Sequence, residues 1–192
     1  MFFATRPSSS AIDRFLRASQ DLPLSYGPIG ILDHTSRRID EQVVTIGRGR
    51  KDFERAKRAL SAWQHFAIGW VEAFPRGASI EPGTVVAVLI RHLGFWSLNG
   101  CRVVYHLADD DRRFGFAYGT LTNHAEAGEE LFALELDPAT ETVRYRIRAV
   151  SWPRAPLARI GQPVVRHLQG RFTRDSAVAM AHSVAGVTVL DK

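Results

Sequence analysis

The spacing of hydrophobic residues changes twice along the chain, from a helical period to a strand period and back. Apolar positions three or four residues apart predict helices over 9–20, from 52 to just before 69, and from about 157 to 182. Ser9 or Ser10 is the expected N-cap of the first helix, and Asp52 that of the second. Pro163 falls within the third, where we expect a kink or a restart. The apolar stripe of this last helix comprises Leu157, Ile160, Val164, Leu168, Phe172 and Ala179.

A period of two dominates the middle of the chain. It predicts strands over 39–46, 70–74, 84–92, 101–108, 112–121, 129–137 and 142–151. Turn residues separate most of them, at 75–77, Asn99-Gly100, 109–111 and Asp137-Pro138. Short connections of this kind favour an antiparallel meander over βαβ units. We therefore predict an α+β fold in which a curved antiparallel sheet of about six or seven strands holds the long C-terminal helix.

The stretch 112–130 (RRFGFAYGTLTNHAEAGEE) has an unusual strand composition. Phe114, Phe116, Tyr118 and Thr120 share one face, whereas the opposite face carries only glycine and alanine. Glycine inside a strand weakens it and usually marks a close approach of another segment or a bulge.

Polarity fixes the pairing of the last two strands, because a one-residue slip would turn every side chain to the other face. Matching the faces pairs Leu136 with Val143, Leu134 with Tyr145, Phe132 with Ile147, and Glu130 with Ala149. The same rule for the preceding hairpin pairs Phe114 with Leu136, Phe116 with Leu134, Tyr118 with Phe132, and Thr120 with Glu130.

This register predicts that Glu130 lies on the inward, apolar face. It is expected near the hydroxyls of Tyr118 and Thr120 and beneath the loop that carries His124. A carboxylate there either finds hydrogen-bond donors or has its pKa raised by desolvation. The alternative is that Glu130 lies at the sheet edge, where solvent or an arginine satisfies it.

Three segments resemble uncharacterised protein family 0548, a family of unknown function. They are GxGxxxFxxAxxAL..W..F..GW from Gly47, CRVVYHLADDDRRFGFAYGTL..H...GEE from Cys101, and RAVSWPRAPLARIGQPVVRHLQGRFTRDS from Arg148. Thr122 stands where relatives often have proline, and Trp152 interrupts a serine-proline pair. The resemblance covers about residues 3–182, which implies a single domain over 1–192 with a tail at 183–192. The order of elements also resembles the helix-grip (START-like) fold of the lipid-transfer and pollen-allergen superfamily, whose members enclose a hydrophobic cavity.

That resemblance implies a ligand cavity between the sheet and the last helix. The residues expected to line it share the inward face: Phe114, Phe116, Tyr118, Thr120, Glu130, Phe132, Leu134, Tyr145 and Ile147. The alternative is that these side chains simply fill the core. Glu130, His124 and Tyr118 are the candidates for acid or base chemistry, although a loop histidine can equally be solvated.

Other candidate sites are weaker. The GRGR run at 47–50 precedes a helix and could hold an anion, but it lacks a third glycine and a βαβ unit. Cys101 is expected to be an inert core thiol. No cysteine or histidine spacing indicates a metal, so neither a metal nor a cofactor is predicted.

Composition limits the classes of function. Apolar residues make up 45% of the chain and the net charge is +5, with 22 arginines spread along its length. A nucleic-acid footprint would be clustered, so no nucleic-acid partner is expected. No apolar run approaches the roughly 20 residues of a membrane span, and no signal peptide is recognised, which favours a cytoplasmic location. The oligomeric state is left open.

Three functions follow from these patterns. The first is binding of a small hydrophobic or amphipathic molecule in the sheet–helix cavity. The second is an enzyme on the same fold, a cyclase, hydrolase or isomerase that uses Glu130 and His124 for proton transfer. The third is arginine-mediated binding to nucleic acid or a membrane surface, against which internal pairing of the arginines is expected.

Overall fold

The fold is seen in a computed structural model that describes residues 1–107, 110–154 and 162–186. Its α-helices and strands follow one another in the predicted order, and two short 3-10 helices and a two-residue strand occur in addition. The elements are β1 (Phe2–Phe3), α1 (Ser9–Ser19), η1 (Ile31–Asp33), β2 (Asp40–Arg48), α2 (Gly49–Ser61), η2 (Gln64–Phe66), β3 (Val71–Phe74), β4 (Val85–His92), β5 (Phe95–Leu107), β6 (Arg113–Thr120), β7 (Glu126–Leu136), β8 (Thr142–Pro153) and α3 (Gln162–Ala185).

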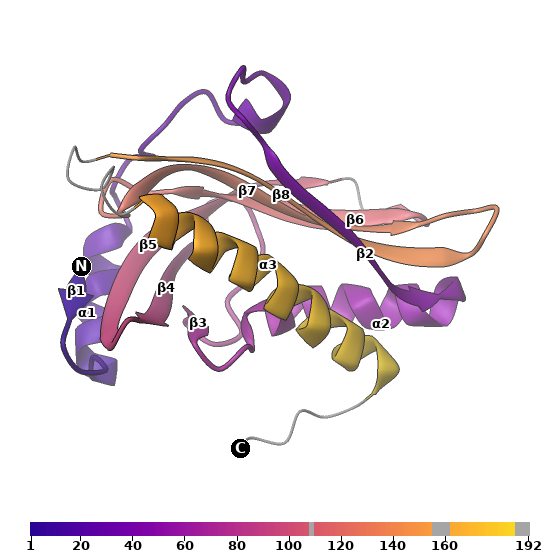
Figure 1. The fold of residues 1–192 in the computed structure, drawn as a ribbon, viewed down its shortest axis with the longest axis horizontal. Helices are drawn as coiled ribbons and strands as arrows, with labels where there is room; N and C mark the ends of the chain where they lie inside the picture. Colours follow the sequence, from indigo (N-terminus) through magenta and orange to yellow (C-terminus); the bar gives the residue numbers. More distant parts are fainter. Residues whose placement is uncertain (108–109, 155–161, 187–192) are drawn as a thin grey trace.

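One curved antiparallel sheet forms the framework. Its strand order is β2-β8-β7-β6-β5-β4-β3, and β1 pairs with β5 beside this path. The sheet bends around α2 and α3, which lie on its inner side, while α1 lies at the β4–β5 end (Figure 1). The predicted α+β helix-grip architecture is therefore confirmed.

The apolar side chains form one large core on the inner side of the sheet. It joins buried residues of α2, η2 and α3 to the inward faces of the seven strands β2 to β8. A second cluster packs α1 on the outer faces of β4 and β5, and a third lies under the segment that contains η1. The alternation read from the sequence thus buries both faces of the sheet, because helices or loops cover each side.

The β7–β8 pairing has the register that polarity predicted. Leu136 faces Val143, Leu134 faces Tyr145, Phe132 faces Ile147 and Glu130 faces Ala149. On the outward face Glu135 lies opposite Arg144, and its carboxylate accepts from Arg146 Nε at 3.2 Å.

The β6–β7 pairing is shifted by two residues from the prediction. Phe114 pairs with Leu134, Phe116 with Phe132, and Tyr118 with Glu130. The connecting loop is shorter than expected because Thr120 binds Gly128: its Oγ1 accepts from the Gly128 amide at 2.9 Å and donates to the Gly128 carbonyl at 3.2 Å. A shift of two keeps every side chain on its predicted face, so polarity could not detect it. Glu130 consequently lies opposite Tyr118 and not Thr120.

The predicted turn at Asn99-Gly100 is wrong, because both residues lie within β5. The real turn joins His92 to Phe95 through Leu93 and Gly94, whose φ angles of 49° and 80° suit a two-residue hairpin loop. A Cβ on Gly100 would come within 2.3 Å of the Asn123 side chain. This glycine therefore allows a close approach and does not make a turn.

The helix ends also differ from the predictions. Ser8 is the N-cap of α1, and α2 begins at Gly49, with Asp52 in its first turn. The chain leaves α2 after Ser61 and forms η2, so the predicted helix is interrupted before Trp63. Pro163 is the second residue of α3, where a missing amide costs no helical hydrogen bond and no kink is needed.

The last helix also ends later than predicted. The helix α3 continues to Ala185, beyond the expected end near residue 182. Of the predicted apolar stripe of α3, Leu168 and Phe172 pack against the core and Ala179 is buried. Leu157, Ile160 and the side chain of Val164 lie outside the described residues.

Candidate functional site

Most of the predicted cavity lining is packed tightly. Phe116, Phe132, Leu134, Tyr145 and Ile147 are all at most 3% exposed, and Phe114 packs partly buried at one edge. The short helix η2 occupies the space in front of them. The ring of His65 lies 4.4 Å from that of Phe132, and Phe66 lies 5.1 Å from Phe172 of α3. The middle of the inner face is therefore filled by aromatic side chains.

Glu130 lies beyond this aromatic cluster, on the inward face as predicted. Strand pairing places it next to Tyr118, whose hydroxyl donates to Glu130 Oε2 at 2.6 Å. Tyr118 is almost fully buried and Glu130 is half-buried. The Glu130 side chain thus lies at the margin of the apolar core, with the Tyr118 hydroxyl as the hydrogen-bond partner of its carboxyl group.

Desolvation raises the pKa of Glu130 to about 7, although the Tyr118 hydrogen bond lowers it. The neighbouring carboxylate of Glu126 adds to the rise. Burial also raises the pKa of Tyr118 well above its usual value, so this phenol remains a donor. Near neutral pH the Glu130 carboxyl group is therefore protonated in part of the molecules and ionised in the rest.

A second carboxylate extends this polar end of the inner face. Glu126 accepts from Ser151 Oγ at 3.3 Å and from Gln169 Nε2 of α3 at 3.2 Å. Burial raises its pKa, which these two bonds partly oppose. The side chains of Glu126, Glu130 and Tyr118 therefore form one polar group beside α3, which we call the Glu130 cluster.

The other two predicted polar residues have structural partners. Thr120 is 6% exposed and its hydroxyl is bound to Gly128 and, at 2.5 Å, to Ser25. His124 lies in the β6–β7 loop, where its Nδ1 accepts from the Glu126 amide at 2.9 Å. Burial lowers the pKa of His124 to about 4, so the ring is a neutral acceptor that holds the turn. In the described residues, no contact joins His124 to Glu130.

Sequence reasoning missed the role of Glu129. This residue is 2% exposed on the outer face of the sheet. Its carboxylate accepts from Tyr26 Oη at 2.7 Å, from the Gly30 amide at 2.9 Å and from Tyr105 Oη at 3.0 Å. Glu129 thereby fastens the segment before β2 onto the sheet. A Cβ on Gly119 would lie 2.3 Å from the Tyr26 hydroxyl, which explains the small face of β6.

The remaining candidate residues are accounted for by the fold. At the GRGR run, Asp52 Oδ2 accepts from the Arg48 amide at 2.9 Å and so occupies the start of α2 itself. Cys101 is fully buried in β5, and burial raises its pKa. The outward arginines of β8 are paired internally as expected, Arg144 with Asp137 at 3.4 Å and Arg148 with Asp33 at 3.1 Å.

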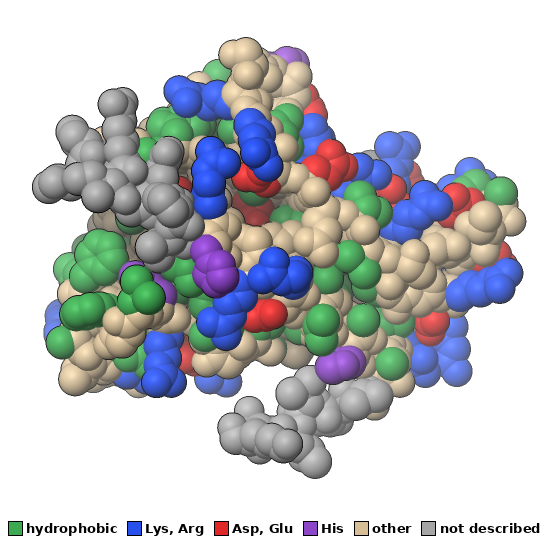
Figure 2. All heavy atoms as spheres, in the orientation of Figure 1, with side chains coloured by type: hydrophobic (Ala, Val, Ile, Leu, Met, Phe, Trp, Pro, Cys, Tyr) green, Lys and Arg blue, Asp and Glu red, His purple; other side chains and the backbone are tan. Residues whose placement is uncertain are grey.

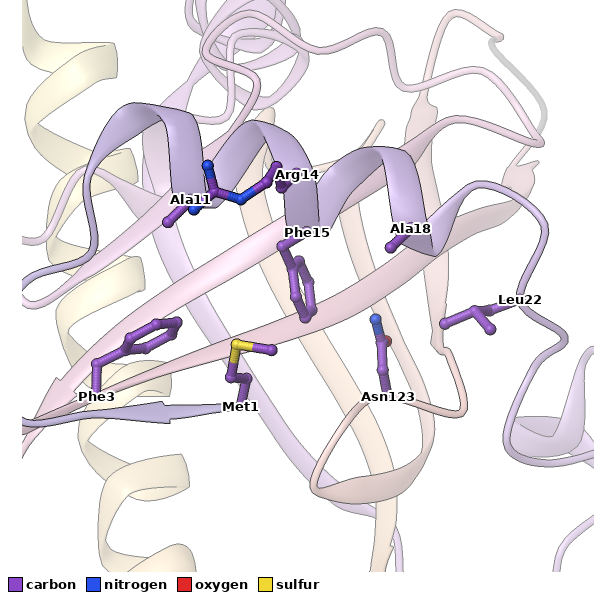
Figure 3. Close-up of a pocket in the computed structure, with 8 residues that line it drawn as sticks. All are labelled: Met1, Phe3, Ala11, Arg14, Phe15, Ala18, Leu22 and Asn123. Atoms are coloured by element: carbon purple, nitrogen blue, oxygen red, sulfur yellow. The ribbon is translucent and has the colours of Figure 1, made fainter.

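Two of the pockets on the surface of the described residues stand out, and neither is lined by the predicted cavity residues. One, of about 550 Å³, lies between α1 and β1 on the outer side of the sheet (Figure 3). Phe15 points into it from α1, and Asn123 enters from the β6–β7 loop. The other, of about 360 Å³, lies between the β4–β5 turn and the first half of α3.

Two negative findings apply to the described part of the chain. It contains no group of three or more histidine, cysteine or acidic residues placed to hold a metal. Among its helices, none has both the length and the apolar character needed to cross a membrane.

Comparison with known proteins gives consistent matches. The model of a domain of unknown function, DUF1990, matches residues 31–179. A UPF0548 protein of Dictyostelium discoideum is 30% identical over 208 residues, which covers 96% of both chains. Another, from Deinococcus radiodurans, is 35% identical over 193 residues and covers 92% of this chain and 96% of the relative.

Solved structures share the architecture at low sequence identity. A Thermus thermophilus protein superposes with a TM-score of 0.54 and 12% identity, covering 79% of this chain and 99% of its own. Norcoclaurine synthase from Thalictrum flavum superposes with a TM-score of 0.50 and 10% identity, covering 90% and 100%. At such identities the likeness concerns the fold alone.

Proposed function

The chain belongs to the DUF1990 (UPF0548) family, and we propose that it binds a small hydrophobic or amphipathic molecule against the inner face of the sheet. The Glu130 cluster would hold the polar end of this ligand, and Phe132 and Phe172 would contact its apolar part. The observation that carries the proposal is the position of Glu130: a partly buried residue on the inward face of the sheet, whose carboxyl group is bound by Tyr118 and has no described cationic partner.

The chemistry of the Glu130 carboxyl group determines which polar groups of a ligand can bind to it. With a pKa of about 7, the Glu130 carboxyl group can either donate or accept a hydrogen bond near neutral pH. Tyr118 holds one of its oxygens and leaves the other for a ligand. A hydroxyl, amide or amine on an otherwise apolar molecule matches this arrangement. Norcoclaurine synthase, which shares the fold, has been solved with dopamine and hydroxybenzaldehyde, two molecules of this size and character.

The aromatic packing imposes a condition on this proposal. Because η2 fills the middle of the inner face, a ligand larger than a few atoms would require Phe66 or Phe172 to change rotamer. Phe66 of η2 and Phe172 of α3 pack against each other across two separate elements, and Phe172 is only partly buried. Such a rearrangement is a side-chain movement and leaves the sheet unchanged.

The test is native mass spectrometry of the protein purified without detergent or organic solvent. We expect an adduct mass that disappears on denaturation, and binding of the uncharged apolar dye Nile red once that adduct has been removed. Glu130→Gln should lower the retained fraction at least tenfold, because its amide cannot change protonation with the ligand. Glu135→Gln, on the outer face, is the matched control. A bare chain mass together with no dye binding would contradict the proposal.

A proton-transfer enzyme on the same fold is the second candidate, favoured by the Glu130 pKa of about 7. In this version Glu130 exchanges a proton with the ligand and Tyr118 holds the carboxylate in place. His124 has no part in it, since its ring is committed to the loop. Incubating the purified protein with the molecule identified by mass spectrometry should then yield a product, and Glu130→Gln should bind the molecule without converting it.

A further inference from the structure

The pocket between the β4–β5 turn and α3 has a basic rim and an apolar wall. It measures about 360 Å³ and is separate from the Glu130 cluster. Figure 2 shows arginine and histidine side chains close together over the first half of α3. The lining residues are Trp70, Arg91, His92, Leu93, Gly94, His167, Leu168 and Arg171. No carboxylate is among these described residues.

Arg171 is held in place at this pocket by two neighbours. Its guanidinium carbon lies 4.5 Å from the centre of the Trp70 ring. Its Nε donates to Asp175 Oδ2 at 3.3 Å, and the same oxygen accepts from Trp70 Nε1 at 2.8 Å. No partner for its terminal nitrogens is found within the described part of the chain. A guanidinium fixed on one edge with donors left on the other is suited to bind a carboxylate or a phosphate.

A second arginine adds positive charge next to the pocket. Arg91 has no acidic partner in the residues that the structure describes, and its guanidinium lies over the Trp96 ring, 5.8 Å from the ring centre, on the side of the sheet that carries α1. His92 and His167 lie on opposite sides of the pocket, one on β4 and one on α3. Burial lowers the pKa of His92, so its ring is a neutral hydrogen-bonding group. Asp175 neutralises the charge of Arg171 and leaves that of Arg91, which attracts anions to the pocket.

Apolar side chains continue from the pocket onto the surface. Leu93 is 74% exposed at the turn, Phe95 is 54% exposed and Phe2 is 65% exposed. The Phe2 ring meets His92 edge-on, 6.1 Å between centres, so the apolar surface adjoins the basic rim. Together with Trp70 and Leu168, these residues offer an apolar track next to the fixed guanidinium. An anion alone would leave this track uncovered.

We propose that this pocket binds the anionic head of a short-chain amphiphile, a carboxylate or a phosphate monoester on an alkyl chain. Arg171 contacts the head, Arg91 adds attraction from nearby, and the chain lies against Trp70 and Leu168. The volume is near the lower end of the range of small-molecule sites, roughly 300–1,000 Å³, which suits a short chain. The site goes beyond the proposed function because it does not involve Glu130.

Calorimetry with octyl phosphate below its micelle concentration tests the proposal, with octanol and inorganic phosphate as partial ligands. We expect octyl phosphate to bind at least tenfold more tightly than either, and more weakly as salt is raised. Equal binding of octanol would overturn the proposal, because the head would then contribute nothing. No binding of octyl phosphate, or binding only to vesicles of an anionic phospholipid, would also overturn it.

A pair of variants on one helix separates the pocket from general charge. Arg171→Gln should weaken octyl phosphate binding about tenfold or more, since a charge-assisted hydrogen bond is lost. Arg174→Gln removes the same charge three residues away, outside the lining, and should leave the affinity nearly unchanged. Equal losses in both would overturn the proposal. Glu130→Gln should keep full affinity, so failure of the proposed ligand site and failure of this pocket give different results.

Discussion

At the residue scale, His65 is the most unusual side chain in the core. It is 0% exposed, and within the described structure both ring nitrogens lack a hydrogen-bond partner. Its neighbours are rings: Trp63 stacks on it at 5.6 Å, and Phe116 lies 5.9 Å away. Burial lowers the pKa of His65 to about 3, so the folded protein holds the neutral form.

This burial makes stability depend on pH. The unfolded chain binds a proton at His65 below about pH 6.5, whereas the folded protein does so only near pH 3. Stability from this group is thus complete above pH 6.5 and is lost as the pH falls toward 3. Between pH 6.5 and 5.0 the protonation of His65 in the unfolded chain should lower the free energy of unfolding by about 1.5 kcal/mol. Urea unfolding should show this loss in the natural protein and not in His65→Leu.

Comparing how the free energy of unfolding changes with pH in the natural protein and in His65→Leu separates the effect of His65 from that of other groups. Glu130 acts in the opposite direction, because its raised pKa favours the protonated folded state at low pH and costs stability as the pH rises from about 4.5 to about 7. This contribution is the same in both proteins and cancels. Equal loss of stability in the two proteins over the acid range would contradict the account of His65.

At the element scale, the β7 strand shows how backbone spacing constrains a residue type. Gly128 has a φ of 156°, and a Cβ there would lie 1.9 Å from the Val150 carbonyl oxygen of β8. The two strands therefore come together at a point where only glycine fits. The next two residues point to opposite faces, as in any strand, so Glu129 meets the Tyr26 segment and Glu130 meets Tyr118.

Replacing Gly128 tests this constraint. Gly128→Ala should lower the free energy of unfolding by about 3 kcal/mol, because β7 and β8 must separate to admit the methyl group. Gly170→Ala in α3 is the matched control, since its nearest atom would be the Arg174 side chain at 3.6 Å. That change should raise stability by about 0.5–1 kcal/mol, as alanine favours a helix. Thermal unfolding of the two variants should shift in opposite directions, and parallel shifts would refute the steric explanation.

At the scale of the whole molecule, α3 joins parts of the chain that the sequence keeps far apart. It packs against α2, η2 and β2, and the Tyr145 hydroxyl of β8 lies 3.0 Å from Ser176 Oγ. Met180 and Val184 are buried in the large inner core with Phe53 and Val143. The helix therefore closes the open side of the curved sheet, as Figure 1 shows.

Truncating this contact should weaken the entire fold. Met180→Ala should cost about 2–5 kcal/mol, because a fully buried side chain leaves a cavity in the core. Val178→Ala, two residues earlier and 54% exposed, should change stability by less than about 0.5 kcal/mol. Urea unfolding followed by circular dichroism measures both. A Met180→Ala protein as stable as Val178→Ala would show that α3 contributes little to the closure of the sheet.

Local patterns in the sequence were sufficient for much of the architecture. Alternating arginines and apolar residues in β8 determined which face of β8 continues each face of β7, and the short connection between Leu136 and Val143 then gave the register. The same alternation placed Glu130 on the inward face and Glu129 on the outer one. The order of helices and strands followed from the change of period, which each segment carries within itself.

Tertiary structure decided what lies against these faces. The two-residue shift between β6 and β7 keeps every face, so it became visible only through the bond of Thr120 to Gly128. The insertion of His65 and Phe66 into the predicted cavity, and the Tyr26–Glu129 bond, join residues more than 50 positions apart. Periodicity in a sequence determines which way a side chain points. Which distant segment meets it depends on the packing of the whole chain, where volume, hydrogen bonding and charge must be satisfied together.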